Sequence, residues 1–215
     1  MIIVDGVMYE RNQVAAIDVD ALKCFTEDCP DELPVPGGND IIVELNKQAM
    51  LADLRIASKE AHTKGAVHEA TEDEPQFTLV TGYPNVDQKW NQHGVPGTKG
   101  FEFIDGLRME MYDMVIYKGV EIDMHPYGIC YHDYDKKIHT GVIPALRGAN
   151  KRVAIVGGLA LNYCVKETVM ELLDADFVVV VNLGACRGLG DTTEAVNEMK
   201  NAGAFFVDTC KKLKV

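Results

Sequence analysis

The chain has 215 residues, a length that suits one enzyme-sized domain whose core needs no disulfide or metal to hold it together. Hydrophobic residues make up 47% and charged residues 25%, which excludes a disordered or fibrous protein. The formal net charge of −12 argues against a nucleic-acid partner, because phosphate binding needs clustered Lys and Arg. No apolar run approaches the roughly 18 residues of a membrane span, and residues 1–12 do not resemble a secretory signal. We therefore expect a cytoplasmic protein with no membrane or nucleic-acid partner.

The cysteines point to the same compartment. None belongs to a CxxC pair, and they are spread along the chain at positions 24, 29, 130, 164, 186 and 210. Free thiols in a reducing compartment are therefore expected rather than disulfides, and one of them is a candidate for catalysis.

The N-terminal half begins with a small ribbon and then changes to a strand and a helix. IIVDGVMYE holds two short apolar runs around Asp5-Gly6, a type I′ turn signal that predicts a β-hairpin. VAAID (14–18) reads as a buried strand. The apolar spacing of 39–54 predicts a helix, with Asn39 as its N-cap.

Strands and helices alternate through the rest of the chain. RIAS (55–58) reads as a strand, and the irregular stretch 60–105 is long enough to suggest function. Further strands are expected at 113–119, 152–158, 177–184 and 205–208, and helices at 136–149, 162–175 and 191–203. Strands that are apolar on both faces indicate a parallel sheet covered on both sides. We expect a single domain (1–215) of the α/β class, with three αβα layers, a mainly parallel sheet of about six strands and the N-terminal hairpin.

Ligands of open α/β sheets bind beyond the carboxyl ends of the strands. The side chains expected there include Asp18, Lys118 and Cys164. A thiol is mostly protonated at neutral pH, so a nucleophilic Cys needs a base or a positive neighbour. Asp18 and Lys118 would supply both. Taken alone, Cys164 is more often a packed core residue, and that alternative stays open at this point.

A second cluster contains imidazoles and a carboxylate. KEAHTKGAVH (59–68) and WNQHGVPGTKG (90–100) supply Glu60, His62, His68 and His93. These donors suit zinc, iron or manganese. The six-residue spacing of His62 and His68 matches no helical pair, so the prediction depends on their position after a strand.

Three more histidines, His125, His132 and His139, fall seven residues apart. Pro126 and Gly128 would interrupt any helix that could align them, so we interpret the spacing as coincidence. The segment is expected to be a lid over the active site or a subunit contact.

These segments resemble the isochorismatase-like cysteine hydrolases and, among them, the nicotinamidases. AAIDVDALKCF resembles the strand that carries the catalytic Asp, here Asp18. DMVIYKG resembles the segment of the catalytic Lys, here Lys118, and GGLALNYCVKET that of the nucleophile, here Cys164. KEAH and WNQHGVPGTKG are similar to the metal-binding segments. The likeness spans residues 14–210.

The resemblance implies hydrolysis of nicotinamide to nicotinic acid and ammonia. Asp18 would accept the thiol proton, Lys118 would stabilise the charges, and Cys164 would attack the carboxamide. The oxyanion would bind the N–H groups of Ala160 and Cys164, with the Leu159–Ala160 peptide in the cis form.

The resemblance also implies a divalent metal that holds the pyridine nitrogen, with zinc the first choice and iron or manganese as alternatives. Its ligands would be Glu60, His62 and His93, with His68 as a further candidate. The ring pocket would be lined by Phe25, Trp90 and Leu159.

Two other readings stay open. The chain could be another amidase of the same fold, acting on an N-carbamoyl or ureido compound, or a catalytically idle relative that serves as a binding module. Glu60 stands where the family commonly has Asp, a change that could alter the metal or its geometry. A homo-oligomer is expected, because members of the family that the chain resembles are often oligomers.

Overall fold

A six-stranded sheet forms the centre of the molecule in the computed structural model, which describes residues 1–214. The strand order is β5-β4-β3-β6-β7-β8, and every neighbouring pair is parallel. The strands are β3 (Val14–Val19), β4 (Leu54–Glu60), β5 (Met114–Lys118), β6 (Val153–Gly158), β7 (Val178–Cys186) and β8 (Phe205–Val207). The parallel sheet expected from the sequence is confirmed.

The N-terminal hairpin is also confirmed. Strands β1 (Ile2–Val4) and β2 (Val7–Tyr9) pair antiparallel. Asp5 and Gly6 between them have φ angles of 48° and 75°, as a type I′ turn requires at both central positions.

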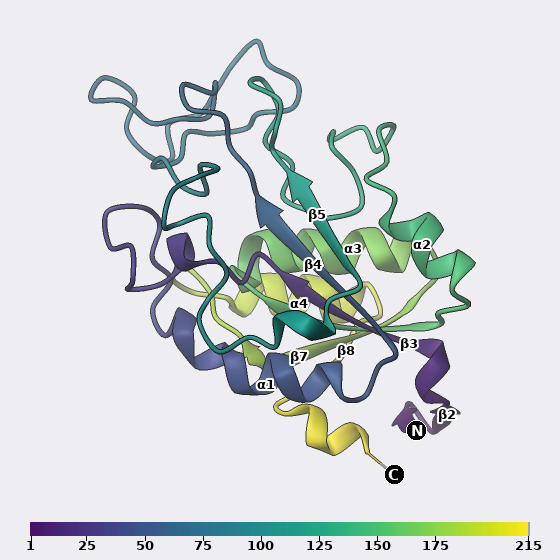
Figure 1. Cartoon of the computed structure of the whole chain (residues 1–215). Coiled ribbons are helices and arrows are strands. Elements are labelled where there is room, and N and C mark those ends of the chain that lie inside the picture. Colours follow the sequence, from purple (N-terminus) through teal and green to yellow (C-terminus); the bar gives the residue numbers. More distant parts are fainter. Residues whose placement is uncertain (215) are drawn as a thin grey trace.

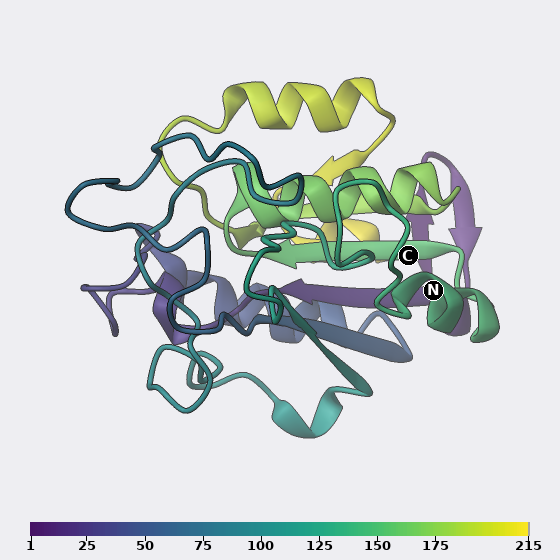
Figure 2. The same ribbon diagram turned by 90° about the horizontal axis from the view of Figure 1, so that it is seen from above.

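Helices cover both faces of the sheet (Figures 1 and 2). Leu45 of α1 packs with Ala185 of β7 on one face, whereas Val169 of α3 packs with Ile17 and Val156 on the other. The helices are α1 (Ile42–Ala49), α2 (Val142–Gly148), α3 (Lys166–Asp174) and α4 (Thr193–Asn201). Short 3-10 turns occur at Arg11–Gln13, Lys23–Phe25, Gly38–Ile41, Met109–Met111 and Cys210–Leu213, and a π-helical turn at Leu161–Val165. The three αβα layers are therefore present.

Two helices are shorter than predicted. The segment 39–54 opens with the 3-10 turn, whose N-cap is Gly37 with φ 72° rather than Asn39, and α1 ends at Ala49. The helix expected at 136–149 starts only at Val142, because the carboxylate of Asp133 accepts the N–H groups of residues 137 and 138 and fixes a turn there.

The long irregular segment predicted at 60–105 is also found. Isolated bridges such as Glu69–Trp90 and Leu79–Gln88 hold it in place. In Figure 1 the arrowheads of β4 and β5 point toward these loops, whereas both termini lie at the opposite end. The loops therefore cover the carboxyl ends of the strands, where an α/β sheet binds its ligands.

In residues 1–214, none of the helices combines the length and apolar character needed to cross a membrane.

Candidate active site

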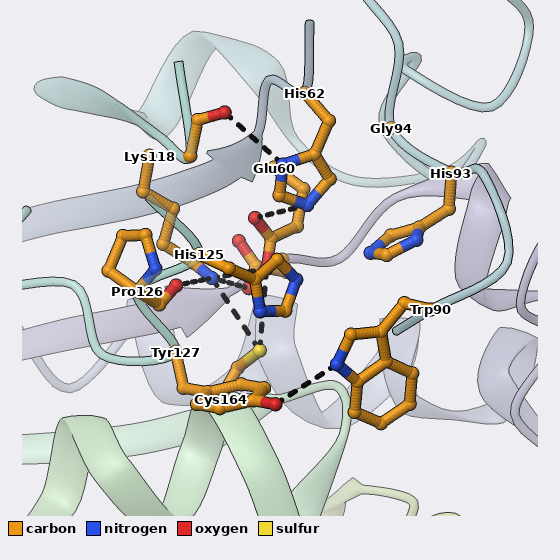
Figure 3. A network of polar contacts seen from close by, with 12 residues as sticks. Glu60, His62, Trp90, His93, Gly94, Lys118, His125, Pro126, Tyr127 and Cys164 are labelled. Atoms are coloured by element: carbon orange, nitrogen blue, oxygen red, sulfur yellow. Dashed lines mark hydrogen bonds and ion pairs between the residues drawn. The ribbon is translucent and has the colours of Figure 1, made fainter. Parts of the chain in front are cut away.

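The strand order reverses between β3 and β6, which are adjacent although β4 and β5 separate them in the chain. Such a switch point opens a crevice beyond the strand ends. The thiol of Cys164 lies there, in the π-helical turn that follows β6. Lys118, the last residue of β5, points to the same place, and its Nζ lies 3.5 Å from Cys164 Sγ. Figure 3 shows this pair. Two of the three predicted catalytic residues are thus brought together.

The third, Asp18, is not with them, and its placement corrects the sequence prediction. Its carboxylate accepts hydrogen bonds from Arg55 Nη2 (2.6 Å) and Nε (3.0 Å), Gln48 Nε2 (2.8 Å) and Tyr112 Oη (2.7 Å). The four hydrogen bonds satisfy this buried carboxylate, and the Arg55 guanidinium supplies its counter-charge. The carboxylates beside Lys118 belong to Glu60 and to Asp20, whose Oδ2 lies 3.0 Å from Lys118 Nζ.

The strand is one residue longer than the predicted VAAID (14–18). β3 runs on to Val19, so Asp18 is inside the strand, where side chains alternate between the faces and Asp18 points toward α1. Asp20 is the first residue beyond the strand end and has φ 45°. Its Oδ1 accepts a hydrogen bond from Ser58 Oγ at 2.8 Å, and Ser58 Oγ accepts the Asp20 N–H at 3.1 Å. The apolar Val19 between the two acids was the signal that the strand continues.

Charges at this centre are tightly coupled. The ammonium of Lys118 forms ion pairs with Asp20 and with Glu60 Oε1, and it also donates to the carbonyl of Pro126 at 3.3 Å. Burial, opposed by the Lys118 charge, raises the pKa of Asp20 to about 6. Although burial acts against it, Lys118 holds the pKa of Glu60 well below its usual range. Asp20 is therefore the better proton acceptor of the two carboxylates near neutral pH.

Burial raises the pKa of the Cys164 thiol, against the attraction of Lys118. The thiol is therefore protonated at rest and needs a base. One oxygen each from Asp20 and Glu60 lies within 4.8 Å of Cys164 Sγ. The site can take a proton from the sulfur at the moment of attack.

The loop between β6 and Cys164 approaches β3 closely. A Cβ at Gly158 would lie 2.0 Å from the carbonyl oxygen of Val19, and Gly158 has φ 135°, so only glycine fits. The Leu159–Ala160 peptide is cis, as the resemblance implies. Within residues 1–214, the N–H of Ala160 donates to no acceptor, which leaves it free for a ligand.

Beside the thiol, four buried side chains named as metal-ligand candidates converge. The ring of His62 lies 4.2 Å from that of His68 and 4.7 Å from that of His93, centroid to centroid. His62 Nε2 faces Glu60 Oε2 at 3.1 Å. Apart from that contact, neither atom has a hydrogen-bond partner in the described chain, nor does His68 Nδ1.

This donor set fits a divalent transition metal. Burial and the neighbouring rings lower the pKa of His68 to about 2 and that of His93 to about 3, so both imidazoles are neutral, as metal ligation requires. His62 Nδ1 lies 3.2 Å from the carbonyl oxygen of Gly119, and His93 Nδ1 lies 2.6 Å from that of Asn91. Such outer contacts orient metal-binding imidazoles and leave the other nitrogen free.

Sequence reasoning missed one more member of this cluster, His125. Its ring stacks on that of His62 (Figure 3) at a centroid distance of 5.0 Å. It also lies 4.4 Å from the ring of His68. His139 is exposed and packs on Tyr131 instead. The seven-residue spacing thus has no structural meaning, and no sequence signal distinguished His125 from its neighbours.

A cavity opens onto the thiol, His93 and His125. Phe25 and Trp90 line it as predicted, together with Tyr127 and Tyr163. Leu159 does not, because its side chain is fully buried in the core against the Gly38 turn. Trp90 Nε1 donates to Tyr127 Oη at 3.0 Å, which fixes the aromatic wall. The cavity suits a small flat molecule.

Known proteins resemble the chain over most of its length, although no protein-family model matches it. It is 25% identical over 203 residues to the nicotinamidase of Acinetobacter baylyi, covering 91% of this chain and 92% of the relative. The solved nicotinamidase/pyrazinamidase of Acinetobacter baumanii superposes with a TM-score of 0.86 at 22% identity, covering 94% of this chain and 99% of that one. The pyrazinamidase of Pyrococcus horikoshii, solved in complex with zinc, superposes with a TM-score of 0.72 at 26% identity, covering 91% and 98%.

The fold is also that of an isochorismatase-like hydrolase from Alkaliphilus metalliredigens, with a TM-score of 0.63 at 20% identity and 91% of each chain covered. In this chain, a buried thiol, an ammonium and a carboxylate lie together at the switch point of that shared fold. Over nearly its whole sequence, the chain is similar to curated nicotinamidases.

Proposed function

We propose that the protein hydrolyses nicotinamide to nicotinic acid and ammonia in the salvage of NAD. The observation that carries the proposal is the placement of the Lys118 ammonium between the Cys164 thiol and the Asp20 carboxylate, next to a cluster of buried histidines. The relatives named nicotinamidase support the substrate. A structure of a related protein from L. infantum in complex with nicotinate supports the product.

In the proposed reaction, Asp20 accepts the thiol proton as Cys164 Sγ attacks the carboxamide carbon. The carbonyl oxygen becomes an oxyanion and is bound by the N–H groups of Ala160 and Cys164. Asp20 then gives the proton to the amide nitrogen, the C–N bond breaks, and ammonia leaves. Water attacks the thioester with Asp20 as base, the C–S bond breaks, and nicotinic acid and the free thiol are formed.

Lys118 lowers the activation free energy of these reaction steps without exchanging a proton. Its positive charge stabilises the thiolate as it forms and holds Asp20 in position. Because the proton moves between groups that share one buried cation, the net charge of the site stays constant while the thiol loses its proton.

The proposed metal ligands are Glu60, His62 and His93, with His68 as the fourth. When bound, the metal would supply a positive charge that holds the pyridine nitrogen of the substrate. Phe25 and Trp90 would pack on the ring. Zinc is the first choice, because a related pyrazinamidase was solved in complex with zinc and neutral imidazoles suit it.

An assay of both products tests the proposal. The protein loaded with zinc is expected to release ammonia and nicotinic acid from nicotinamide in equal amounts, and Cys164→Ala is expected to release neither. An amidase for N-carbamoyl or ureido compounds would turn over those substrates in preference to nicotinamide. A catalytically idle relative would release no ammonia from any of them. A cytoplasmic location and a homo-oligomeric assembly stay part of the proposal.

A further inference from the structure

His125 is a buried imidazole whose two ring nitrogens have no hydrogen-bond partner among the described residues. The residue is 2% exposed, and neither Nδ1 nor Nε2 makes a hydrogen bond within residues 1–214. Leaving a buried polar atom unpaired costs about 1–3 kcal/mol, so such groups call for an explanation. A role in packing alone would be met at lower cost by an apolar ring.

Its backbone is fixed on both sides. The His125 N–H donates to the carbonyl of Asn85 at 2.8 Å, and its own carbonyl accepts the Tyr134 hydroxyl at 3.0 Å. Trp90 stacks on the ring at 6.1 Å, and Tyr127 meets it edge-on at 5.0 Å. Since the ring makes no hydrogen bond to residues 1–214, these two aromatic neighbours set its orientation.

The nitrogens of His125 lie where a metal would bind. One ring nitrogen from each of His62, His68 and His125 lies within 4.8 Å of the other two. Glu60, the only carboxylate of the cluster, gives one of its oxygens to Lys118, so it can offer the metal the other oxygen alone. The cluster is therefore short of oxygen donors and rich in imidazoles.

We propose that His125 is a direct ligand of the metal centre and forms a three-imidazole face with His62 and His68. This inference rests on the proposed function in one respect, namely that a metal ion binds at this centre. A nitrogen-rich set selects zinc, iron or nickel over magnesium and manganese, which prefer oxygen donors. His125 also lines the cavity with Cys164, so the metal would lie at the wall of the substrate site.

The test measures metal binding without substrate. Zinc affinity is determined by competition with a chromophoric chelator for the wild type, His125→Phe and His139→Ala. Loss of an outer-shell partner costs about 10–100-fold in metal affinity, so loss of a ligand is expected to exceed about 100-fold. His125→Phe should show that loss, whereas His139→Ala should bind zinc like the wild type. The visible spectrum of the Co²⁺ form should change in His125→Phe only.

A phenylalanine keeps the ring packed between Trp90 and Tyr127, so a packing role would be preserved in this variant. Wild-type zinc affinity and an unchanged Co²⁺ spectrum in His125→Phe would overturn the inference. If this variant does not fold, His125→Gln is measured in the same way. Failure of the proposed function has a different signature, namely His125-dependent zinc binding without release of ammonia from nicotinamide.

Discussion

The ammonium of Lys118 lies 3.0 Å from Asp20 Oδ2, whereas Asp18, two residues earlier, is paired with Arg55 at 2.6 Å. The two acids are both fully buried, but they serve different purposes. Asp20 faces the thiol, and Asp18 ties β3 to α1 and β4. Substitutions that remove one charge at a time should separate catalysis from stability.

Asp20→Asn removes the proposed proton acceptor. A positioned general base contributes about 10²–10⁴-fold, so kcat for nicotinamide should fall by that factor. Steady-state ammonia release from the folded, metal-loaded variant measures the fall. An activity within a few-fold of the wild type would exclude Asp20 as the base.

Asp18→Asn is the matched change at the neighbouring acid. It leaves the Arg55 guanidinium buried without its counter-charge, which costs about 3–5 kcal/mol in the free energy of unfolding. Urea denaturation should show this loss, while the folded fraction keeps a kcat close to that of the wild type. A catalytic defect as large as that of Asp20→Asn would contradict the assignment.

The sheet could be predicted from the sequence because its buried strands are apolar runs bounded by turns, as in RVAIVGG and FVVVVNLG. Lys118 and Cys164 were identified because each stands at or just after a strand end. The prediction for Asp18 is wrong, because this charged residue lies inside the strand VAAIDV. Its partner, Arg55, is distant in the sequence, so no local pattern indicates the ion pair. His125 was missed because its position depends on the path of a loop, which no local pattern encodes.

Cys164→Ala should abolish hydrolysis, because no other thiol contacts Lys118 in the described chain. Cys210→Ala is the control: this cysteine is buried against the N-terminal hairpin, on the opposite end of the sheet from the active site. The activity of Cys210→Ala should equal that of the wild type. Ammonia release at saturating nicotinamide compares the two variants. Residual activity in Cys164→Ala would exclude Cys164 as the nucleophile.

Removal of the metal should lower both activity and stability. A metal that binds only the folded chain stabilises it by about 2.7 kcal/mol at 100 times its Kd. Dialysis against a chelator should therefore reduce Tm and stop ammonia release, and added Zn²⁺ should restore both. Full activity in protein shown by elemental analysis to be metal-free would contradict the proposed metal site.

Glu171 of α3 gives a pH effect that is independent of catalysis. Burial raises the pKa of its carboxyl from 4.5 to about 7, although the N–H of Cys130 donates to it at 2.8 Å. The protonated form is favoured in the folded state, so this stabilisation is complete below pH about 4.5 and is lost as the pH rises through about 7.

Glu171→Gln cannot ionise and should escape that loss. Its stability relative to the wild type should therefore rise between pH 4.5 and 7, by about 3 kcal/mol for a shift of this size. Urea unfolding across that range measures the difference. Stability curves that stay parallel over the whole range would show that burial does not raise the pKa of Glu171.

The central claim is that Cys164 forms a thioester with the acyl group of nicotinamide. Partitioning with hydroxylamine tests it most directly, because hydroxylamine competes with water for an acyl-enzyme. We predict that the wild type forms nicotinohydroxamic acid in a share that rises with hydroxylamine concentration, and that Cys164→Ala forms none. Release of nicotinic acid alone at every hydroxylamine concentration would contradict a covalent intermediate and, with it, the role of Cys164.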